Sequence, residues 1–358
     1  MQIDQSTSLS GSSAQSTAFP YLDWAVGLGG VWLITGLYLD GWAHHHLTLE
    51  SFFSPWHAVL YSGFFISAAS VGLAFLNGLR QGRPWREALP IPYRASLLGS
   101  IIFLFGGLAD MTWHTLFGIE QRLDALLSPP HLVLALGASL LITGPLRAAV
   151  MQAQHPSQAG SPPTSPGPTV RLPFPALLSI SVLVALLGFF NMYTHPWIEL
   201  SDRPFGSIRL INLFRIEYLR PSVMVSAVLL QSLILVSAVL FLVRRFRLPP
   251  GALTFLFTFT TFLAASIHTN WGLIPLGLLA GAAADALVPL LRPGERPYGT
   301  QLFAFLLPVI QYSLFFGALK LSGDLAWTHQ LWTGTIFLAG IAGWLASMNT
   351  FPADQTRK

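Results

Sequence analysis

Long apolar runs recur along almost the whole chain, and they restrict its fold more than any other feature. Each run is about 20 residues long, the length that an α-helix needs to cross roughly 30 Å of hydrocarbon. Only 9% of the 358 residues are charged, against about 25% in a typical soluble domain, so the chain cannot cover a globule in water. The sequence predicts an all-α integral membrane protein with about ten transmembrane helices. The expected spans are residues 22–40, 56–78, 95–117, 129–150, 173–194, 222–243, 251–271, 273–291, 301–320 and 331–349.

Polar segments divide this chain into two membrane halves. The segment around residues 152–171 is rich in Pro, Ser and Gly, a composition typical of linkers. The expected organisation is a disordered cytoplasmic tail (1–20), a four-helix metal-binding half (21–150), the linker (151–172), a six-helix membrane half (173–350) and a second cytoplasmic tail (351–358).

Arginine and lysine are distributed unevenly between alternate loops. Under the positive-inside rule, the bias predicts that both termini are cytoplasmic. All ten histidines except His155 then map to the outer ends of spans. The sequence therefore predicts a multi-pass protein of the bacterial inner membrane with its chemistry on the outer side. The same rule accounts for the net charge of +4 without a nucleic-acid partner.

The chain contains no cysteine. This excludes disulfides, thiolate metal sites and iron–sulfur clusters. Any bound metal must be held by His, carboxylate, amide or Met.

One pattern occurs twice in the front half, as "DGWAHHHLTLESFFSPWH" (40–57) and "DMTWHTLFGIEQRLDALLSPPH" (110–131). In each copy an Asp precedes a His by four positions, a Glu follows that Asp by ten, and the copy ends in Ser-Pro-x-His. The pattern indicates an internal duplication of a helical hairpin, with both copies in the same orientation.

The spacing within each copy has a physical meaning. Residues four apart on a helix share a face, so the Asp and the first His point the same way. Ser-Pro favours a helix start with Ser as N-cap, which places the last His in the first turn of the next helix. Each hairpin then gathers one carboxylate and two imidazoles, a set that suits Cu, Zn, Fe or Mn. The predicted ligands are Asp40, His44 and His57 in the first copy and Asp110, His114 and His131 in the second.

A hydrogen-bonded polar belt at the membrane interface is the alternative to a metal site. Ionisable groups at the edge of hydrocarbon are costly unless they are paired or bound to metal, and the repetition of the whole unit favours metal. Other polar residues could support the ligands or face a substrate, and His45 and His46 could be exposed loop residues or could also support the ligands. Asp285 could serve a proton path or pair with a neighbour. The supporting candidates are Glu50, Glu120, Asn191, His195, His268, Asp324 and His329.

The first copy, Asp40-x3-His44 followed by "FFSPWH" and His57, resembles the copper motif of the C subunit of particulate methane and ammonia monooxygenases. That subunit is a helical membrane protein, and its motif runs Asp-x3-His and then a Phe-x-Pro-x-His helix start. The resemblance covers about residues 35–135. It implies copper as the metal at this set.

The same family has a second ligand set about one hairpin later, with Asn in its first position. Asp110, His114 and His131 fall where that set would be, with Asp in place of Asn and a longer gap between the two histidines. The resemblance thus implies a second copper site. It also implies partner membrane or periplasmic subunits, because the family's activity depends on them; a homo-oligomer is a further expectation.

Three functions remain open from the sequence. The first is a copper-dependent oxygenase or oxidase that acts near the outer membrane face on a small molecule reached through the bilayer. The second is a metal storage or transport protein, although a transporter should place ionisable groups along a path across the membrane. The third is a bis-His haem protein of quinol chemistry, in which the repeated Asp has no part. The sequence favours the first, with copper ahead of zinc, iron or manganese.

Overall fold

The computed structural model describes residues 20–47, 52–118, 126–154, 168–199, 221–323, 325 and 327–348. Within these ranges the chain is helical and forms no β-strand; one isolated β-bridge pairs Arg171 with Arg247. The predicted all-α class is therefore confirmed for the described part of the chain.

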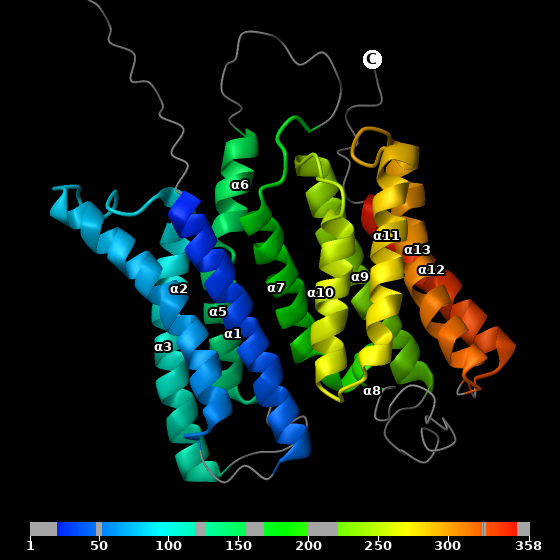
Figure 1. The fold of residues 1–358 in the computed structure, drawn as a ribbon, viewed down its shortest axis with the longest axis horizontal. Helices are drawn as coiled ribbons and strands as arrows, with labels where there is room; N and C mark the ends of the chain where they lie inside the picture. The colour runs from blue at the N-terminus through cyan, green and yellow to red at the C-terminus, as the bar shows by residue number, and fades with distance from the viewer. Residues whose placement is uncertain are drawn as a thin grey trace, which may run out of the picture.

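The long helices lie side by side, and the chain reverses direction from one to the next, except that α6 continues from α5 (Figure 1). Short helical turns connect some of them. The elements are α1 (Pro20–His46), α2 (Pro55–Arg80), α3 (Ile91–Phe117), α5 (Pro129–Ile142), α6 (Gly144–Gln154), α7 (Phe174–Phe190), η1 (Met192–Thr194), α8 (Pro196–Glu199), α9 (Pro221–Arg245), α10 (Ala252–Ser266), η3 (Trp271–Leu273), α11 (Ile274–Leu291), α12 (Pro297–Leu321) and α13 (His329–Met348).

Seven of these helices are long and apolar enough to cross a membrane: α1, α2, α3, α9, α11, α12 and α13. The pair α5 and α6 makes an eighth span if its two parts, bent by 43°, are counted together, whereas α7 and α10 are shorter apolar helices. The chain is thus a multi-pass helical membrane protein by length and composition. Ten crossings and the orientation of the termini stay predictions.

The bend between α5 and α6 has a local cause. Pro145 lacks the N–H that would continue the helix, and the chain breaks at Thr143. The side chains of Ser96, Arg147 and Ser179 donate to carbonyl groups in the last turn of α5. These bonds satisfy backbone groups that hydrocarbon could not.

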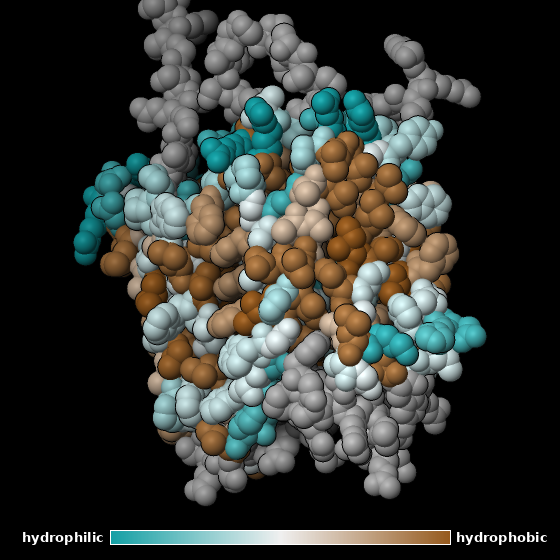
Figure 2. All heavy atoms as spheres, turned by 45° about the vertical axis from the view of Figure 1, so that its right-hand side comes forward, coloured by the Kyte–Doolittle hydropathy of each residue, from teal (hydrophilic) through white to brown (hydrophobic). Residues whose placement is uncertain are grey.

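Large apolar side chains cover much of the surface. Figure 2 shows apolar residues across the middle of one face, with hydrophilic residues gathered towards its upper end. Leu73, Phe105 and Phe337, for example, are 66%, 64% and 59% exposed. Such a band is stable against lipid tails and would aggregate in water.

The first hairpin, α1 with α2, is closely packed through glycine. A Cβ added to Gly36 would lie 2.6 Å from the Leu60 Cα atom, and one added to Gly63 would lie 2.4 Å from the Leu33 backbone nitrogen. Only glycine allows the two backbones to approach this closely. The close approach holds the end of α1 against the start of α2.

The second hairpin, α3 with α5, repeats these contacts at matched positions. A Cβ on Gly106 would lie 3.2 Å from the Leu134 backbone nitrogen, and one on Gly137 would lie 2.6 Å from the Phe103 backbone nitrogen. In both hairpins one glycine lies four residues before the motif Asp and the other lies six residues after the final His. The two hairpins therefore pack in the same register.

In the other half, the buried face of α11 carries the carboxylate that caps α10. The first residue before α10, Gly251, offers no side-chain cap. Asp285 instead accepts from the backbone N–H groups of Leu253 (3.2 Å) and Thr254 (2.8 Å) and from the Thr254 hydroxyl (2.6 Å). Of the two roles expected for Asp285, pairing with a neighbour is the one that these contacts fulfil.

Replacing Asp285 with Ala is expected to lower the free energy of unfolding by about 2–3 kcal/mol, because three donors lose their acceptor in a water-poor setting. Asp285→Asn keeps one acceptor oxygen and should lose less. Thermal unfolding in detergent measures both changes. Equal midpoints for wild type and Asp285→Ala would contradict the capping role.

Candidate metal centres

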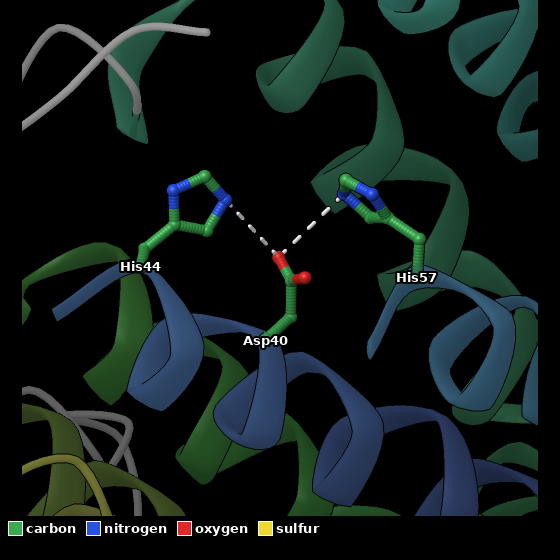
Figure 3. Close-up of side chains that lie close together, drawn as sticks. All are labelled: Asp40, His44 and His57. Carbon is green, nitrogen blue, oxygen red and sulfur yellow. Dashed lines mark ion pairs between the residues drawn. The ribbon is translucent and has the colours of Figure 1, made fainter. Parts of the chain in front are cut away.

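The first ligand set lies where α1 ends and α2 begins. The Asp40 Oδ2 atom is 3.6 Å from His44 Nε2 and 3.6 Å from His57 Nε2 (Figure 3). The side chains of Asp40 and His57 are 11% and 10% exposed, and that of His44 is 24% exposed. The i, i+4 pairing of Asp40 with His44 is thus confirmed, and the hairpin adds His57 from the facing helix.

The start of α2 orients His57. Ser54 is the N-cap and its hydroxyl accepts from the His57 backbone N–H at 3.1 Å, with Pro55 in the first turn. The imidazole Nδ1 donates to the Phe52 carbonyl at 2.7 Å, and the Phe52 ring stacks on it with ring centres 4.8 Å apart. The predicted Ser-Pro helix start is confirmed here, and it fixes the ring with Nε2 towards Asp40.

The second ligand set is more deeply buried than the first. The Asp110 Oδ1 atom lies 3.4 Å from His114 Nε2 and 3.1 Å from His131 Nε2. The side chains of Asp110 and His114 are only 2% and 3% exposed, whereas that of His131 is 24% exposed. The three ligand atoms of each set lie within 4.8 Å of one another.

The supports of the second set differ in detail from those of the first. The His114 Nδ1 atom donates to the Gly118 carbonyl at 3.2 Å, and Gly118 takes a φ of 81°, where glycine is favoured. Ser128 precedes α5 but makes no N-cap bond; its hydroxyl pairs instead with His131 Nδ1 at 3.0 Å. The predicted N-cap bond is therefore replaced by a direct bond to the ligand ring.

The distances in the two sets can be compared with those of a hydrogen-bonded ion pair and of a metal site. A charge-assisted N–H···O bond spans about 2.7–2.9 Å. Ligand N and O atoms that share a tetrahedral ion, each about 2.0–2.2 Å from it, lie about 3.3–3.5 Å apart. Three of the observed separations, 3.6, 3.6 and 3.4 Å, lie close to the second value. The fourth, 3.1 Å between His131 and Asp110, is also within reach of an N–H···O hydrogen bond.

The protonation pattern fits a cation as well. A carbonyl only accepts, so His57 and His114 carry hydrogen on Nδ1, and in a neutral ring the Nε2 lone pair then faces the carboxylate. The Oδ1 atom of Asp40 is buried without a hydrogen-bond partner, and the Oδ1 atom of Asp110 is the one that His114 and His131 approach. A cation between these buried groups would satisfy them.

Three protein ligands leave a tetrahedral ion with an open position. Both sets border one cavity of about 100 Å³, which Asp40, Asp110 and His131 reach together with mainly apolar side chains. A molecule of a few heavy atoms fits such a space. The two sets therefore open onto one small, mostly apolar chamber.

Two aromatic residues lie between the sets, and the sequence did not single them out. Phe52 packs against His57 and also lies 6.3 Å from His114, between ring centres. Tyr61 borders the cavity four residues after His57, with its ring 6.3 Å from that imidazole and its hydroxyl against Gly107. The spacing of Tyr61 from His57 was the available signal, since residues four apart share a helix face.

Two supporting candidates of the back half lie elsewhere. Asn191 ends α7, where its amide donates to the Leu187 carbonyl at 2.7 Å. His195 lies between η1 and α8, accepts from the Trp197 backbone N–H through Nδ1, and borders a second cavity. Burial lowers the pKa of His195 to about 4. Neither residue contributes to the Asp–His–His sets.

Of the other supporting candidates, two are described by the structure and three are not. His268 follows α10 and lies beside His45 and His46. His329 is an exposed residue at the start of α13, near Trp332. Glu50, Glu120 and Asp324 lie outside the described residues.

Comparison with known proteins found no matching family model, no matching curated protein and no matching solved structure. The class that fold and site define is a multi-pass helical membrane protein with two groups of residues that could hold a metal ion. The resemblance to monooxygenase C subunits stays a prediction, and the site has to be assigned from its geometry.

Proposed function

We propose that this protein is a copper-binding integral membrane protein with two mononuclear sites. The observation that supports the proposal is the gathering of one carboxylate and two imidazoles in each Asp–His–His set, with ligand atoms within 4.8 Å of one another and Asp–His separations of 3.1–3.6 Å, near the spacing of ligands around one ion. Two imidazoles and a carboxylate suit copper, zinc, iron and manganese alike. The resemblance of the first motif to monooxygenase C subunits favours copper.

The two hairpins, in this proposal, are copies of one ancestral unit. The motif spacing supports this, and so does the glycine register, which repeats at the same offsets from Asp40 and Asp110 and from His57 and His131. Copies in one orientation would place both sites at one membrane depth. With both termini cytoplasmic, that depth is near the outer face of the bacterial inner membrane.

The proposed activity is that of an oxygenase or oxidase acting on a small apolar molecule. Copper, when bound, would supply the redox chemistry. The protein's residues would hold the ion, leave one position open and keep the reaction space dry. Leu134, Ala138 and Phe189 are among the apolar residues that border the cavity beside the ligands. Partner subunits, as the resemblance implies, would deliver electrons.

A cavity-filling variant tests whether the open positions face a space that admits apolar molecules. Ala138 is buried and borders the cavity. With the copper-loaded protein, xenon is expected to bind beside Cu²⁺ and to show faster NMR relaxation, because an apolar cavity admits such an atom. Ala138→Phe should abolish this effect at a stability cost of about 1–3 kcal/mol.

Ala282→Phe is the matched control, since Ala282 lies exposed on α11. It should leave xenon relaxation unchanged. If xenon relaxes equally in wild type and Ala138→Phe, the shared chamber is wrong. If copper binds without any such chamber, storage becomes the better function.

A further inference from the structure

A second cavity, of about 40 Å³, lies among the helices of the back half and is bordered by several polar side chains. Its walls come from α1, α7, α9, α10 and α12 and from the segment that carries His195 and Trp197. The residues that border it differ from those that border the chamber between the ligand sets. The cavity is therefore a separate space with its own chemistry.

Two amide side chains in this cavity have a polar atom without a partner. Gln231, on α9, is 8% exposed, and its Nε2 atom has no hydrogen-bond partner among the described residues. The Oε1 atom of Gln311, on α12, is buried in the same condition. Both residues border the cavity. Because an unpaired amide is costly in a water-poor interior, both atoms favour a bound partner in this space.

His195 and Tyr38 add polar atoms at another wall of the cavity. The Trp197 backbone N–H donates to His195 Nδ1 at 3.2 Å, so a neutral ring carries its hydrogen on Nε2. The Tyr38 hydroxyl donates to the Ala185 carbonyl at 2.9 Å, and its oxygen can still accept. A Cβ added to Gly188 would lie 3.5 Å from the Tyr38 hydroxyl oxygen and 3.8 Å from His195 Nε2. The two polar atoms thus converge over Gly188, which borders the cavity.

This set of atoms defines the class of ligand. Gln231 and His195 offer N–H donors, which disfavour a cation, whereas Gln311 and Tyr38 offer oxygen acceptors, which disfavour an anion. A neutral molecule that both donates and accepts hydrogen bonds matches the set. Water needs about 10–15 Å³ and two to four polar partners, so the cavity has room for about one to three water molecules.

We propose that this cavity is a site for ordered water in the back half, held by Gln231, Gln311 and His195. The Tyr38 ring packs edge-on against Phe189, with ring centres 5.1 Å apart, and Phe189 borders the chamber beside the ligand sets. The bound water therefore lies one aromatic layer away from that mainly apolar chamber. The water site does not depend on the proposed copper function.

X-ray hydroxyl-radical labelling of the full chain in mild detergent tests the site. Radiolysis of a bound water produces the radical in place, so side chains beside it are oxidised even where bulk solvent does not reach. Tyr312 borders the cavity and is 1% exposed, whereas Phe303, on the same helix, is 0% exposed and belongs to the apolar core. After correction for intrinsic reactivity, Tyr312 is expected to be labelled several-fold faster than Phe303.

The double variant Gln231→Leu/Gln311→Leu removes both unpaired atoms with little change of side-chain size. Labelling of Tyr312 should fall to the level of Phe303. Thermal stability should be kept or raised, because no amide is then left without a partner. Gln330→Leu, at an exposed position on α13, is the matched control and should leave the labelling of Tyr312 unchanged.

The outcomes decide the proposal at each step. Equal corrected rates for Tyr312 and Phe303 in the wild type would show a dry cavity and overturn the water site. Unchanged labelling of Tyr312 in the folded double variant would overturn the role of the two amides. If that variant does not fold, Gly188→Ala replaces it, since its Cβ fits at ordinary contact distances and takes up space beside His195. Labelling of Tyr312 should then fall, and an unchanged rate overturns the site. Copper content of the same samples should stay constant, so failure of the copper proposal would be seen separately.

Discussion

Replacing His57 with Ala is expected to remove about one copper ion per chain and to leave the Asp110 set filled. The reason is that His57 supplies one of only three ligands to the first set, and its Nε2 lies 3.6 Å from Asp40. His131→Ala should do the same to the second set, in which its Nε2 lies 3.1 Å from Asp110. Mass-spectrometric metal analysis and electron paramagnetic resonance on purified protein measure both losses.

Two further variants sharpen this result. Asp40→Asn should weaken the first site less than His57→Ala does, because an amide can coordinate but brings no charge to offset the cation. His329→Ala should change nothing. If metal content is unchanged in both His57→Ala and His131→Ala, the sets are a polar belt and the copper proposal fails. If either single variant loses all metal, one shared site replaces the two proposed.

The ligand sets could be predicted from the sequence because their geometry is local. A spacing of four on a helix fixes Asp40 against His44, and Ser54 with Pro55 fixes the helix turn that carries His57. Each hairpin then needs only its short connection to bring the final His back. The whole set therefore lies within 18 residues of sequence, from Asp40 to His57.

Contacts between distant segments could not be predicted in the same way. His45 and His46 lie more than 200 residues before His268, and no local pattern says that α1 and α10 end side by side. Asn191 and His195 show the converse error: they repeat the i, i+4 spacing, yet His195 borders a different cavity. Spacing selects a helix face, whereas tertiary packing decides what that face meets.

The boundaries of the membrane spans also depend on tertiary contacts and could be predicted only approximately. Hydropathy alone merges α5 and α6 into one run, because Thr143, Gly144 and Pro145 are too few polar or helix-breaking residues to interrupt the apolar average. The bend depends on side chains from other helices, such as Ser96 and Ser179, that satisfy the freed carbonyls. Such partners are visible only once the bundle is assembled.

Removing the metal is expected to destabilise the protein substantially. A ligand at about 100–1,000 times its dissociation constant stabilises the folded state by about 3–4 kcal/mol per site, and a chelator withdraws this. The wild-type protein should therefore unfold at a lower temperature with chelator, and copper should restore the midpoint. The double variant His57→Ala/His131→Ala should show no such dependence. Identical midpoints with and without chelator in the wild type would contradict metal binding.

Asp110→Leu distinguishes a metal site from an ion-pair belt at the second ligand set by the sign of its effect on stability. The Asp110 side chain is 2% exposed, and Leu has nearly its shape. If the carboxylate binds a metal, the metal-free wild type holds a buried charge that faces imidazole lone pairs. Asp110→Leu removes that charge, so the variant should be as stable as chelated wild type or more stable. If the set is an ion-pair belt, removal of one partner should cost about 3–5 kcal/mol. Thermal unfolding of wild type and Asp110→Leu in chelator decides between the two. Only if Asp110 is a metal ligand should its replacement leave the unfolding temperature of the metal-free protein undiminished.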